Sequence, residues 1–282
     1  MLPWLLNVLI AIKVGFCSCT PEVRRLGVSR VRSQYTVERL GRLPRVINES
    51  SGLARRTGNG QVVWTHNDGG GRPVLYSVSL AEPGRLLDSL SLPQLQNIDW
   101  EDLAQQDSSR LFIADLGNNG NTRHDLAIYV VDPSKVTPPQ TIRLRYADQT
   151  AFPPEARNFD CEAVFYRTDS LFLLSKNRSG HMVHLYGLPA RAGENVLTPL
   201  DSVFIKSMVT GAALSPDANT LAVLTYGKVL FFDLSGHPAT RLNRPSGCLR
   251  LPRGQAEAIT YLTPNDLLIT NERGRVYRIR RQ

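Results

Sequence analysis

The six residues DWEDLA, from Asp99 to Ala104, introduce a layout that the chain uses five times. Each copy begins with a short start of this kind, often acidic, and continues through a spacer into an apolar run that ends in polar turn residues. The five starts are ESSGLA (49–54), DWEDLA (99–104), DCEAVF (160–165), VTGAAL (209–214) and QAEAIT (255–260). A pattern that returns at intervals of 46 to 61 residues indicates a repeat architecture.

The runs that follow the starts have the composition of β-strands. The first apolar runs are VVWTHND, LFIADLGNN, LFLLSKNRS, LAVLTYG and LLITNERG, and each precedes a further run such as PVLYSV or LAIYVV. Short runs rich in Val, Ile, Leu, Phe and Tyr, separated by turn residues, favour strands over helices. Units of this length with four strands each are typical of propeller blades, so the sequence predicts an all-β fold, a β-propeller.

The two ends of the chain are expected to meet in one blade. The fifth unit reaches the C-terminus after its third strand, and SQYTVERL (33–40) has strand character without a unit of its own. We therefore expect this N-terminal strand to close the ring, which removes an exposed sheet edge. Five blades are favoured, and a sixth built from residues 22–48 is the alternative. The predicted organisation is a signal peptide at 1–19, a basic linker at 20–32 and one propeller domain at 33–282.

The N-terminal segment predicts export to a bacterial cell envelope. Residues 2–12, LPWLLNVLIAI, are too short an apolar run to span a membrane but suit the core of a signal peptide. Cys19 follows Ser18 and resembles the lipidated cysteine of bacterial lipoproteins, which makes it the candidate lipidation site and membrane anchor. The alternative is an ordinary signal peptide that is removed with its cysteines. For Cys161 and Cys248 we expect two buried free thiols, although export would permit a disulfide.

Composition limits the classes of partner. With 42% hydrophobic and 21% charged residues, the chain resembles a folded globular protein. The net charge is +8, and basic residues cluster at 24–32 and 273–281. No nucleic-acid-binding motif accompanies this charge, so nucleic acid is not an expected partner. Arginine spread over a solvated surface is the favoured interpretation, and attraction to an anionic membrane or ligand is the alternative.

The acidic starts are expected to meet the polar turns at one end of the channel. In a propeller blade the first strand lines the central channel, and its start adjoins the end of the antiparallel second strand. The first-strand positions predicted to face the channel are Ser51, Glu101, Glu162, Gly211 and Glu257. The second-strand positions aligned with them are His66, Asp115, Lys176, Tyr226 and Asn271. The full set of predicted ligand-binding residues is His66, Asn67, Asp68, Asp99, Asp115, Asn118, Asn119, Lys176, Asn177, Tyr226, Asn271 and Glu272.

Carboxylates gathered around a narrow channel need compensation. Each like-charged pair at about 6 Å and an effective dielectric near 20 costs about 3 kcal/mol. Such a ring protonates in part, recruits a basic side chain such as Lys176, or holds a cation. Oxygen donors alone suit a hard cation, so calcium is the candidate cofactor, with Glu101, Glu162 and Glu257 as its ligands. The alternative is structural, because such acids also accept hydrogen bonds from backbone amides of the neighbouring blade.

The turn residues carry a comparable ambiguity. For Asp115, Asn118 and Asn119, turn formation is the favoured role, because Asp, Asn and Gly are the residues that turns select. His66 and Asp68 precede three glycines, which would allow a ligand to approach the backbone closely but which also suit a tight hairpin.

Four sequence runs resemble those of a group of exported bacterial β-propeller proteins whose function is poorly characterised. These runs are THND (65–68), DWEDLA (99–104), IADLGNN (113–119) and SKN (175–177). The resemblance implies a fold and an exported location and does not imply a reaction.

A more distant likeness concerns the Glu-containing starts. They resemble those of calcium-activated nucleotidases and of phytase-like and gluconolactonase-like propellers. This likeness implies that Glu101, Glu162 and Glu257 face a metal, and the sequence departs from it at Ser51 and Gly211.

Two functions are compatible with the sequence, which leaves open whether the chain is an enzyme. The favoured one is a membrane-anchored module that binds a small molecule or an envelope protein through an acidic channel face. The alternative is a calcium-dependent hydrolase of phosphoester, nucleotide or lactone substrates. Its candidate catalytic residues are the bases His66, Asp115 and Glu162, and Lys176 as the anion-binding group. Because no complete catalytic motif is present, binding is favoured.

Overall fold

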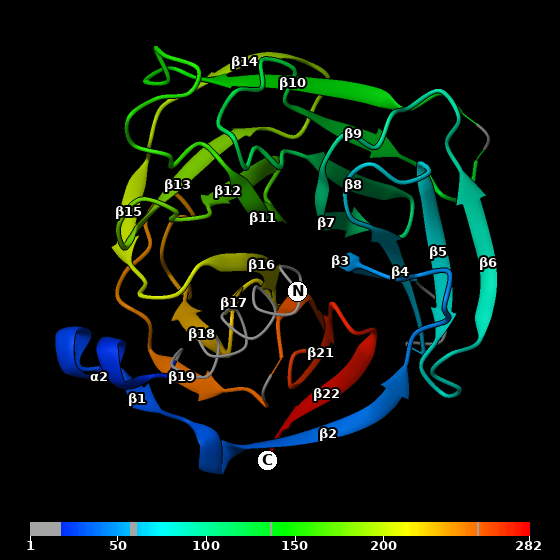
Figure 1. Ribbon diagram of the computed structural model, residues 1–282. Coiled ribbons are helices and arrows are strands. Elements are labelled where there is room, and N and C mark those ends of the chain that lie inside the picture. The colour runs from blue at the N-terminus through cyan, green and yellow to red at the C-terminus, as the bar shows by residue number, and fades with distance from the viewer. Residues whose placement is uncertain (1–17, 57–60, 136, 253) are drawn as a thin grey trace, which may run out of the picture.

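The structure is a computed structural model that describes residues 18–56, 61–135, 137–252 and 254–282. Five antiparallel sheets surround a central axis (Figure 1). The predicted all-β, five-bladed propeller is therefore confirmed, and the alternative of six blades is wrong. The strands that lie closest to the axis contact one another around the ring, as expected for strands that line the channel.

Each blade is a meander of four strands, numbered outward from the axis. Blade one contains β3 (Ser50–Arg55), β4 (Val62–Asn67), β5 (Val74–Ser79) and β6 (Leu86–Ser91). Blade two contains β7 (Trp100–Asp107), β8 (Arg110–Asp115), β9 (Ala127–Val131) and β10 (Gln140–Tyr146). Blade three contains β11 (Cys161–Arg167), β12 (Ser170–Ser175), β13 (Met182–Pro189) and β15 (Asp201–Phe204). Blade four contains β16 (Val209–Leu214), β17 (Thr220–Thr225), β18 (Lys228–Asp233) and β19 (Gly247–Arg250). Blade five contains β20 (Ala256–Thr263), β21 (Asp266–Asn271), β22 (Arg275–Arg281) and β2 (Tyr35–Arg42).

The ring closes with a strand from the opposite end of the chain, as predicted. Strand β2 runs antiparallel to β22 and places Tyr35 opposite Arg281, so the blue and red ends of the ribbon share one sheet in Figure 1. Two further strands were not predicted. Strand β14 (Gly193–Leu197) pairs in parallel with β10, and strand β1 (Ser29–Arg30) pairs in parallel with β19. Both cover the outer edge of a blade, where unpaired backbone groups would otherwise be exposed.

The hydrophobic core is divided into five clusters, and each lies between two neighbouring blades. Adjacent residues of one strand enter different clusters because their side chains alternate between the two faces of the sheet. Thus Leu111 packs between blades one and two, whereas Phe112 packs between blades two and three. Burial on both faces explains why the second strands appear in the sequence as continuous apolar runs.

The segment predicted as a basic linker is part of the folded domain. Residues 20–32 form helix α2 (Thr20–Leu26), strand β1 and the start of a 3-10 turn, η1 (Arg32–Gln34), beside blade four. The fully buried carboxylate of Glu22 lies 2.7 Å from Nζ of Lys228 and accepts a hydrogen bond from the backbone N–H of Lys206. A buried ion pair with this extra hydrogen bond holds the helix against the sheet, and charge composition alone could not show it.

A disulfide joins Cys19 to Cys248, which corrects the expectation that Cys248 is a free thiol. Cys161 is buried and free, as predicted. The disulfide uses the sulfur atom of Cys19 to which a lipid would be attached. Cys19 therefore cannot form this disulfide and carry a lipid at the same time. The predicted core of the signal peptide, residues 2–12, lies outside the described residues.

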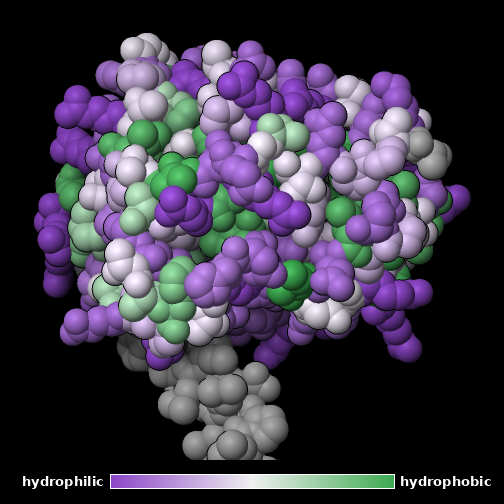
Figure 2. All heavy atoms as spheres, turned by 90° about the horizontal axis from the view of Figure 1, so that it is seen from above, coloured by the Kyte–Doolittle hydropathy of each residue, from purple (hydrophilic) through white to green (hydrophobic). Residues whose placement is uncertain are grey.

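The outer surface is mainly polar. Figure 2 shows one side of the molecule, on which hydrophilic side chains predominate and hydrophobic ones form small separate patches. Within the described part of the chain, no helix has the length and apolar character needed to cross a membrane.

The disulfide generates a stability prediction. It links residues 229 positions apart, and removing a native disulfide from a small domain costs about 2–5 kcal/mol. We expect reductant to lower the urea midpoint of the native chain. The urea midpoint of the double variant Cys19→Ser/Cys248→Ser should not change when reductant is added. Denaturation followed by tryptophan fluorescence would measure both. A native midpoint that is insensitive to reductant would contradict the disulfide.

Candidate functional site

Every innermost strand carries a β-bulge at the same point near its start. In β7, for example, Trp100 pairs with Asp115 and Asp102 pairs with Ala114, so Glu101 has no partner of its own. The five bulged residues are Ser51, Glu101, Glu162, Thr210 and Glu257. A bulge turns its side chain out of the ladder. All five bulged residues line one pocket of about 100 Å³ at one end of the channel.

The predicted convergence of Glu101, Glu162 and Glu257 is therefore correct, but the position in blade four was displaced by one residue. Thr210 occupies the bulge there, whereas Gly211 pairs with Leu224 in the regular ladder. The start of this unit lacks the acid that marks the bulge in three of the others, so alignment by spacing alone placed it wrongly.

The second-strand ends supply the other wall of the pocket. Lys176 and Tyr226 line it, as predicted, together with Asp68, Glu272 and Asn119. The aligned positions in blades one, two and five were wrong. On the second strands, the residues that pair with the residue just before each bulged residue occupy equivalent positions in the five blades. These residues are Asn67, Asp115, Ser175, Thr225 and Asn271. In blades one, three, four and five the pocket-facing residue follows directly, which selects Asp68 rather than His66 and Glu272 rather than Asn271. In blade two the residue that follows Asp115 is Leu116, which does not line the pocket, and Asn119 lines it instead.

His66 and Asp115 have structural partners. The ring of His66 is fully buried, its Nδ1 lies 2.9 Å from the carbonyl oxygen of Asn67, and it meets the ring of Trp100 edge-on. Burial lowers the pKa of His66 to about 4, so the imidazole is neutral at physiological pH. The Asp115 carboxylate lies 2.9 Å from the guanidinium of Arg123 and accepts a hydrogen bond from the hydroxyl of Tyr129. Neither side chain lines the acidic pocket.

Most of the asparagines in the predicted set hold loops. Those whose side chains bond to the backbone are Asn67, Asn118, Asn177 and Asn271. Oδ1 of Asn118, for instance, accepts hydrogen bonds from the N–H groups of Thr122 at 2.9 Å and Arg123 at 3.1 Å. The favoured turn role is thus confirmed for Asn118. Asn119 differs, because it lines the pocket.

Two groups of carboxylates come close enough to share a cation. In each group, one ligand atom per residue lies within 4.8 Å of the others; the groups are Asp68, Asp99 and Glu101, and Glu101, Asp160 and Glu162. Glu257 lines the pocket but belongs to neither group. Its carboxyl instead hydrogen-bonds to that of Glu272. Of the three predicted metal ligands, the structure therefore places Glu101 and Glu162 in such a group.

Glycines make room for the first group. A Cβ at position 117 would collide with the carboxylates of Asp99 and Glu101, and one at position 69 would collide with Asp99. Close approach of a ligand and a tight hairpin are the two roles that the sequence predicts for the glycines after Asp68. The structure shows a third reason at Gly69, which is close approach of the backbone to an acid.

The two groups differ in their charge compensation. In the second group, Glu162 forms an ion pair with Lys176, and Asp160 lies 2.5 Å from Nε of Arg178. The backbone N–H of Asn118 also donates a hydrogen bond to Oδ1 of Asp160 at 2.7 Å. In the first group, Asp68 accepts a hydrogen bond from the N–H of Gly69. The carboxylates of Asp99 and Glu101 accept none from the residues that the structure describes.

Burial and mutual repulsion hold protons in this pocket. Burial raises the pKa of Asp99 to about 6, and Asp68 and Asp160 add to the effect. The pKa of Glu101 lies well above its ordinary value because of burial and the neighbouring Glu162. The pKa of Glu162 itself is raised to about 7, since burial outweighs the attraction of Lys176. Near neutral pH the pocket therefore carries less negative charge than its composition suggests, and a cation would displace the protons.

The structural role foreseen for the starts is performed by a different acid, Asp102. Its Oδ2 accepts hydrogen bonds from the N–H groups of Val164 at 3.0 Å and Ala212 at 3.2 Å, and its Oδ1 accepts one from Leu103. One fully buried side chain of blade two thus binds the innermost strands of blades three and four. The sequence does mark this residue. The start of blade two has two consecutive acids, of which Asp102 is the second, and none of the other four starts has such a pair.

Comparisons with known proteins add little beyond the fold. No protein-family model matches the sequence, and no curated protein sequence matches it. The chain is similar in structure to a Bacteroides thetaiotaomicron protein of unknown function, with a TM-score of 0.49, 9% identity, and coverage of 88% of this chain and 76% of that one. It is also similar to the WD40 repeats of RRP9 (TM-score 0.44, 9% identity, 90% and 99% covered) and to U3-55K (0.44, 12%, 82% and 67%). Similarities of this size carry no argument about function, and the likeness to nucleotidases, phytases and gluconolactonases stays a prediction.

The position of Asp102 predicts a large loss of stability on its removal. In Asp102→Ala, the amides of Val164 and Ala212 lose their acceptor in a buried site, and each unsatisfied group costs about 1–3 kcal/mol. We expect these two amides to contribute a total loss of about 2–6 kcal/mol in urea denaturation. The matched control is Asp107→Ala, which removes an exposed acid from the same strand. Similar midpoints for the two variants would show that Asp102 does not tie the blades together.

Proposed function

We propose that the protein is an exported binding propeller that holds a small hard cation in the acidic pocket. Through that cation it would recognise a small molecule or an envelope protein. The observation that carries the proposal is the group formed by Asp68, Asp99 and Glu101. Its three carboxylates converge within 4.8 Å, and neither Asp99 nor Glu101 forms an ion pair or accepts a hydrogen bond from the residues that the structure describes.

The donor set supports a hard cation. Carboxylate and amide oxygens are the ligands of Ca²⁺ and Mg²⁺, whereas zinc sites use Cys and His. Asn119 lines the same pocket as Asp68 and Glu101, and its side chain carries an amide oxygen of the kind that these cations bind. The pocket volume of about 100 Å³ is well below the 300–1,000 Å³ of typical small-molecule sites, so it suits an ion with a few waters. A cation bound there would supply positive charge at the channel mouth for the oxygen atoms of a partner.

Export is the second part of the proposal. A disulfide is stable in an oxidising compartment and rare in the cytosol, so the Cys19–Cys248 bond supports a location outside the inner membrane. Because that bond uses the sulfur of Cys19, we propose that the signal peptide is removed before this residue and that Cys19 carries no lipid.

Titration with Ca²⁺ tests the cation site. We expect calorimetry to detect specific binding to the native chain. The variant Asp68→Asn/Glu101→Gln should weaken it at least tenfold, because two of the three carboxylates become neutral. Glu257→Gln is the matched control, since this buried glutamate lines the same pocket outside both groups. Absence of heat and of any shift in melting temperature with millimolar Ca²⁺, Mg²⁺ or Mn²⁺ would refute the proposal.

The raised pKa values give this site a defined pH dependence. The pKa values of Asp99 and Glu162 are about 6 and about 7 in the folded chain, above their ordinary values, so the folded chain binds more protons than the unfolded chain between about pH 4 and 7. The metal-free protein should therefore lose stability as the pH rises through this window. Cation affinity should increase over the same range as protons are displaced, with net proton release measurable in buffers of different ionisation enthalpy. An affinity that is equal at pH 5.5 and 7.5 would contradict this linkage.

A calcium-dependent hydrolase is the second candidate, and one observation favours it. Glu162, with a pKa of about 7, faces the pocket beside Lys176, which is a suitable arrangement for a general base and an anion-binding group. The other candidate bases, His66 and Asp115, are held by structural contacts. Under the binding proposal we expect no turnover of nucleoside diphosphates, phosphate esters or lactones that depends on both Ca²⁺ and Glu162. Turnover that is lost in Glu162→Gln would establish the hydrolase instead.

A further inference from the structure

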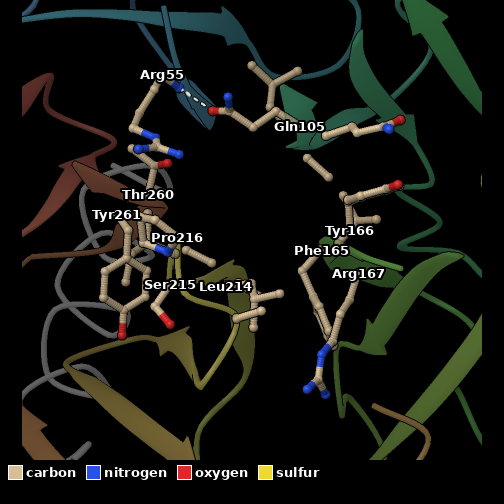
Figure 3. Close-up of a pocket in the computed structure, with 18 of the residues that line it drawn as sticks. Arg55, Gln105, Phe165, Tyr166, Arg167, Leu214, Ser215, Pro216, Thr260 and Tyr261 are labelled. Atoms are coloured by element: carbon tan, nitrogen blue, oxygen red, sulfur yellow. Dashed lines mark hydrogen bonds between the residues drawn. The ribbon is translucent and has the colours of Figure 1, made fainter. Parts of the chain in front are cut away.

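The channel has a second pocket at the opposite ends of the innermost strands (Figure 3). This pocket has a volume of about 260 Å³, and all five blades contribute to it. Its polar lining residues include Arg55, Gln105, Arg167, Ser215 and Thr260. Because the innermost strands run in the same direction through the channel, the bulges lie at one mouth and these residues lie at the other.

The two mouths have opposite charge. The acidic pocket contains five carboxylates and one lysine. The second pocket contains Arg55 and Arg167, and no Asp or Glu of the described chain lines it. The nearby acids are already engaged: Asp102 accepts hydrogen bonds from three backbone amides, Asp169 accepts one from the hydroxyl of Tyr166, and Asp217 accepts one from the hydroxyl of Ser215. The second mouth therefore favours an anionic ligand.

The two arginines are not equally available. The guanidinium of Arg167 donates hydrogen bonds to the carbonyl oxygens of Leu234 and His237 at 3.3 and 3.0 Å, which ties it to blade four. The guanidinium of Arg55 makes one long hydrogen bond, 3.4 Å, to the carbonyl oxygen of Leu262. No carboxylate of the described chain forms an ion pair with Arg55. A half-buried guanidinium with most of its five donors unused is a site for a planar anion.

Gln105 adds a neutral donor on the same wall. Figure 3 shows Arg55 and Gln105 beside each other, and Oε1 of Gln105 accepts the backbone N–H of Arg55 at 2.6 Å. This bond fixes the amide and leaves its NH₂ group as a donor. Below these polar groups the lining is apolar, with Leu53, Leu103 and Ile259. The pocket thus combines one cationic fork, one neutral donor and an apolar floor.

We propose that this second pocket binds a small monocarboxylate with a short apolar body. The carboxylate would lie against the Arg55 guanidinium and the Gln105 amide, and the apolar body would cover the floor. A monocarboxylate matches one available guanidinium, because Arg forms two parallel hydrogen bonds with a planar carboxylate. A dianionic phosphate would need further cationic donors, and those of Arg167 are occupied by carbonyl groups. The volume of about 260 Å³ accommodates a ligand of the size of benzoate or a short fatty acid.

The site is tested with benzoate, phenylacetate and hexanoate as probes of the purified full-length chain. Saturation-transfer NMR and calorimetry should detect millimolar or tighter binding of at least one of them. Benzamide tests the apolar body without the charge, and inorganic phosphate tests anionic charge without the apolar body. Both should bind at least tenfold more weakly than the carboxylate that binds best. Arg55→Gln should reduce carboxylate affinity at least tenfold.

The matched control is Arg56→Gln. Arg56 is the next residue, but its guanidinium lies 3.9 Å from Asp88 and over the ring of Trp64, outside the pocket. This variant should bind carboxylate as the native chain does, and both variants should melt at the native temperature. The proposal is overturned if no carboxylate binds at 10 millimolar, if phosphate binds more tightly than benzoate, or if Arg55→Gln binds as well as Arg56→Gln. Because Asp68→Asn/Glu101→Gln alters only the other mouth, it should leave carboxylate binding intact whether or not the cation site exists.

Discussion

The bulge near the start of each innermost strand is the constraint on which the rest of this propeller depends. It leaves one residue per blade outside the ladder and turns its side chain toward the axis. Because all five strands begin at the same end of the channel, residues from 51 to 257 meet in one small pocket. Asp102 follows one of these bulges and uses its position to bind the strands of two other blades. The same local distortion thus generates both the candidate site and a cross-link of the ring.

Gathering acids in this way has an electrostatic consequence that differs between the two carboxylate groups. Asp160 and Glu162 are compensated within the chain by Arg178 and Lys176, so their charges contribute to the structure. Asp99 and Glu101 form no ion pair, and burial and the repulsion of neighbouring acids raise the pKa of both carboxyls. The negative charge of the two groups is therefore offset in different ways, by ion pairs in one and by retained protons in the other.

The sequence was sufficient for the fold because the propeller is built from repeats. Five starts, their spacing and the strand-like terminal segment predicted the blade number and the ring closure, since each depends on periodicity rather than on individual contacts. The register of the strands, which decides which residue occupies each position, was harder to predict from the sequence. A bulge adds one residue without changing composition, so spacing selected Gly211 where the structure has Thr210, and His66 where it has Asp68. The disulfide between Cys19 and Cys248 could not be predicted either, because nothing local relates two positions so far apart.

The two channel mouths differ in their charged residues, and the innermost strands separate them. The residues that separate the pockets are the buried aliphatic side chains of the innermost strands together with Asp102, whose oxygens are occupied by backbone amides. Burial and, to a smaller extent, Glu162 at the acidic mouth raise the pKa of Asp102, so this carboxyl senses the charge of that mouth. The strands between the mouths are held in position by the five clusters between the blades. The two mouths thus differ in charge because one end of the same five strands carries acids and the other end carries Arg55.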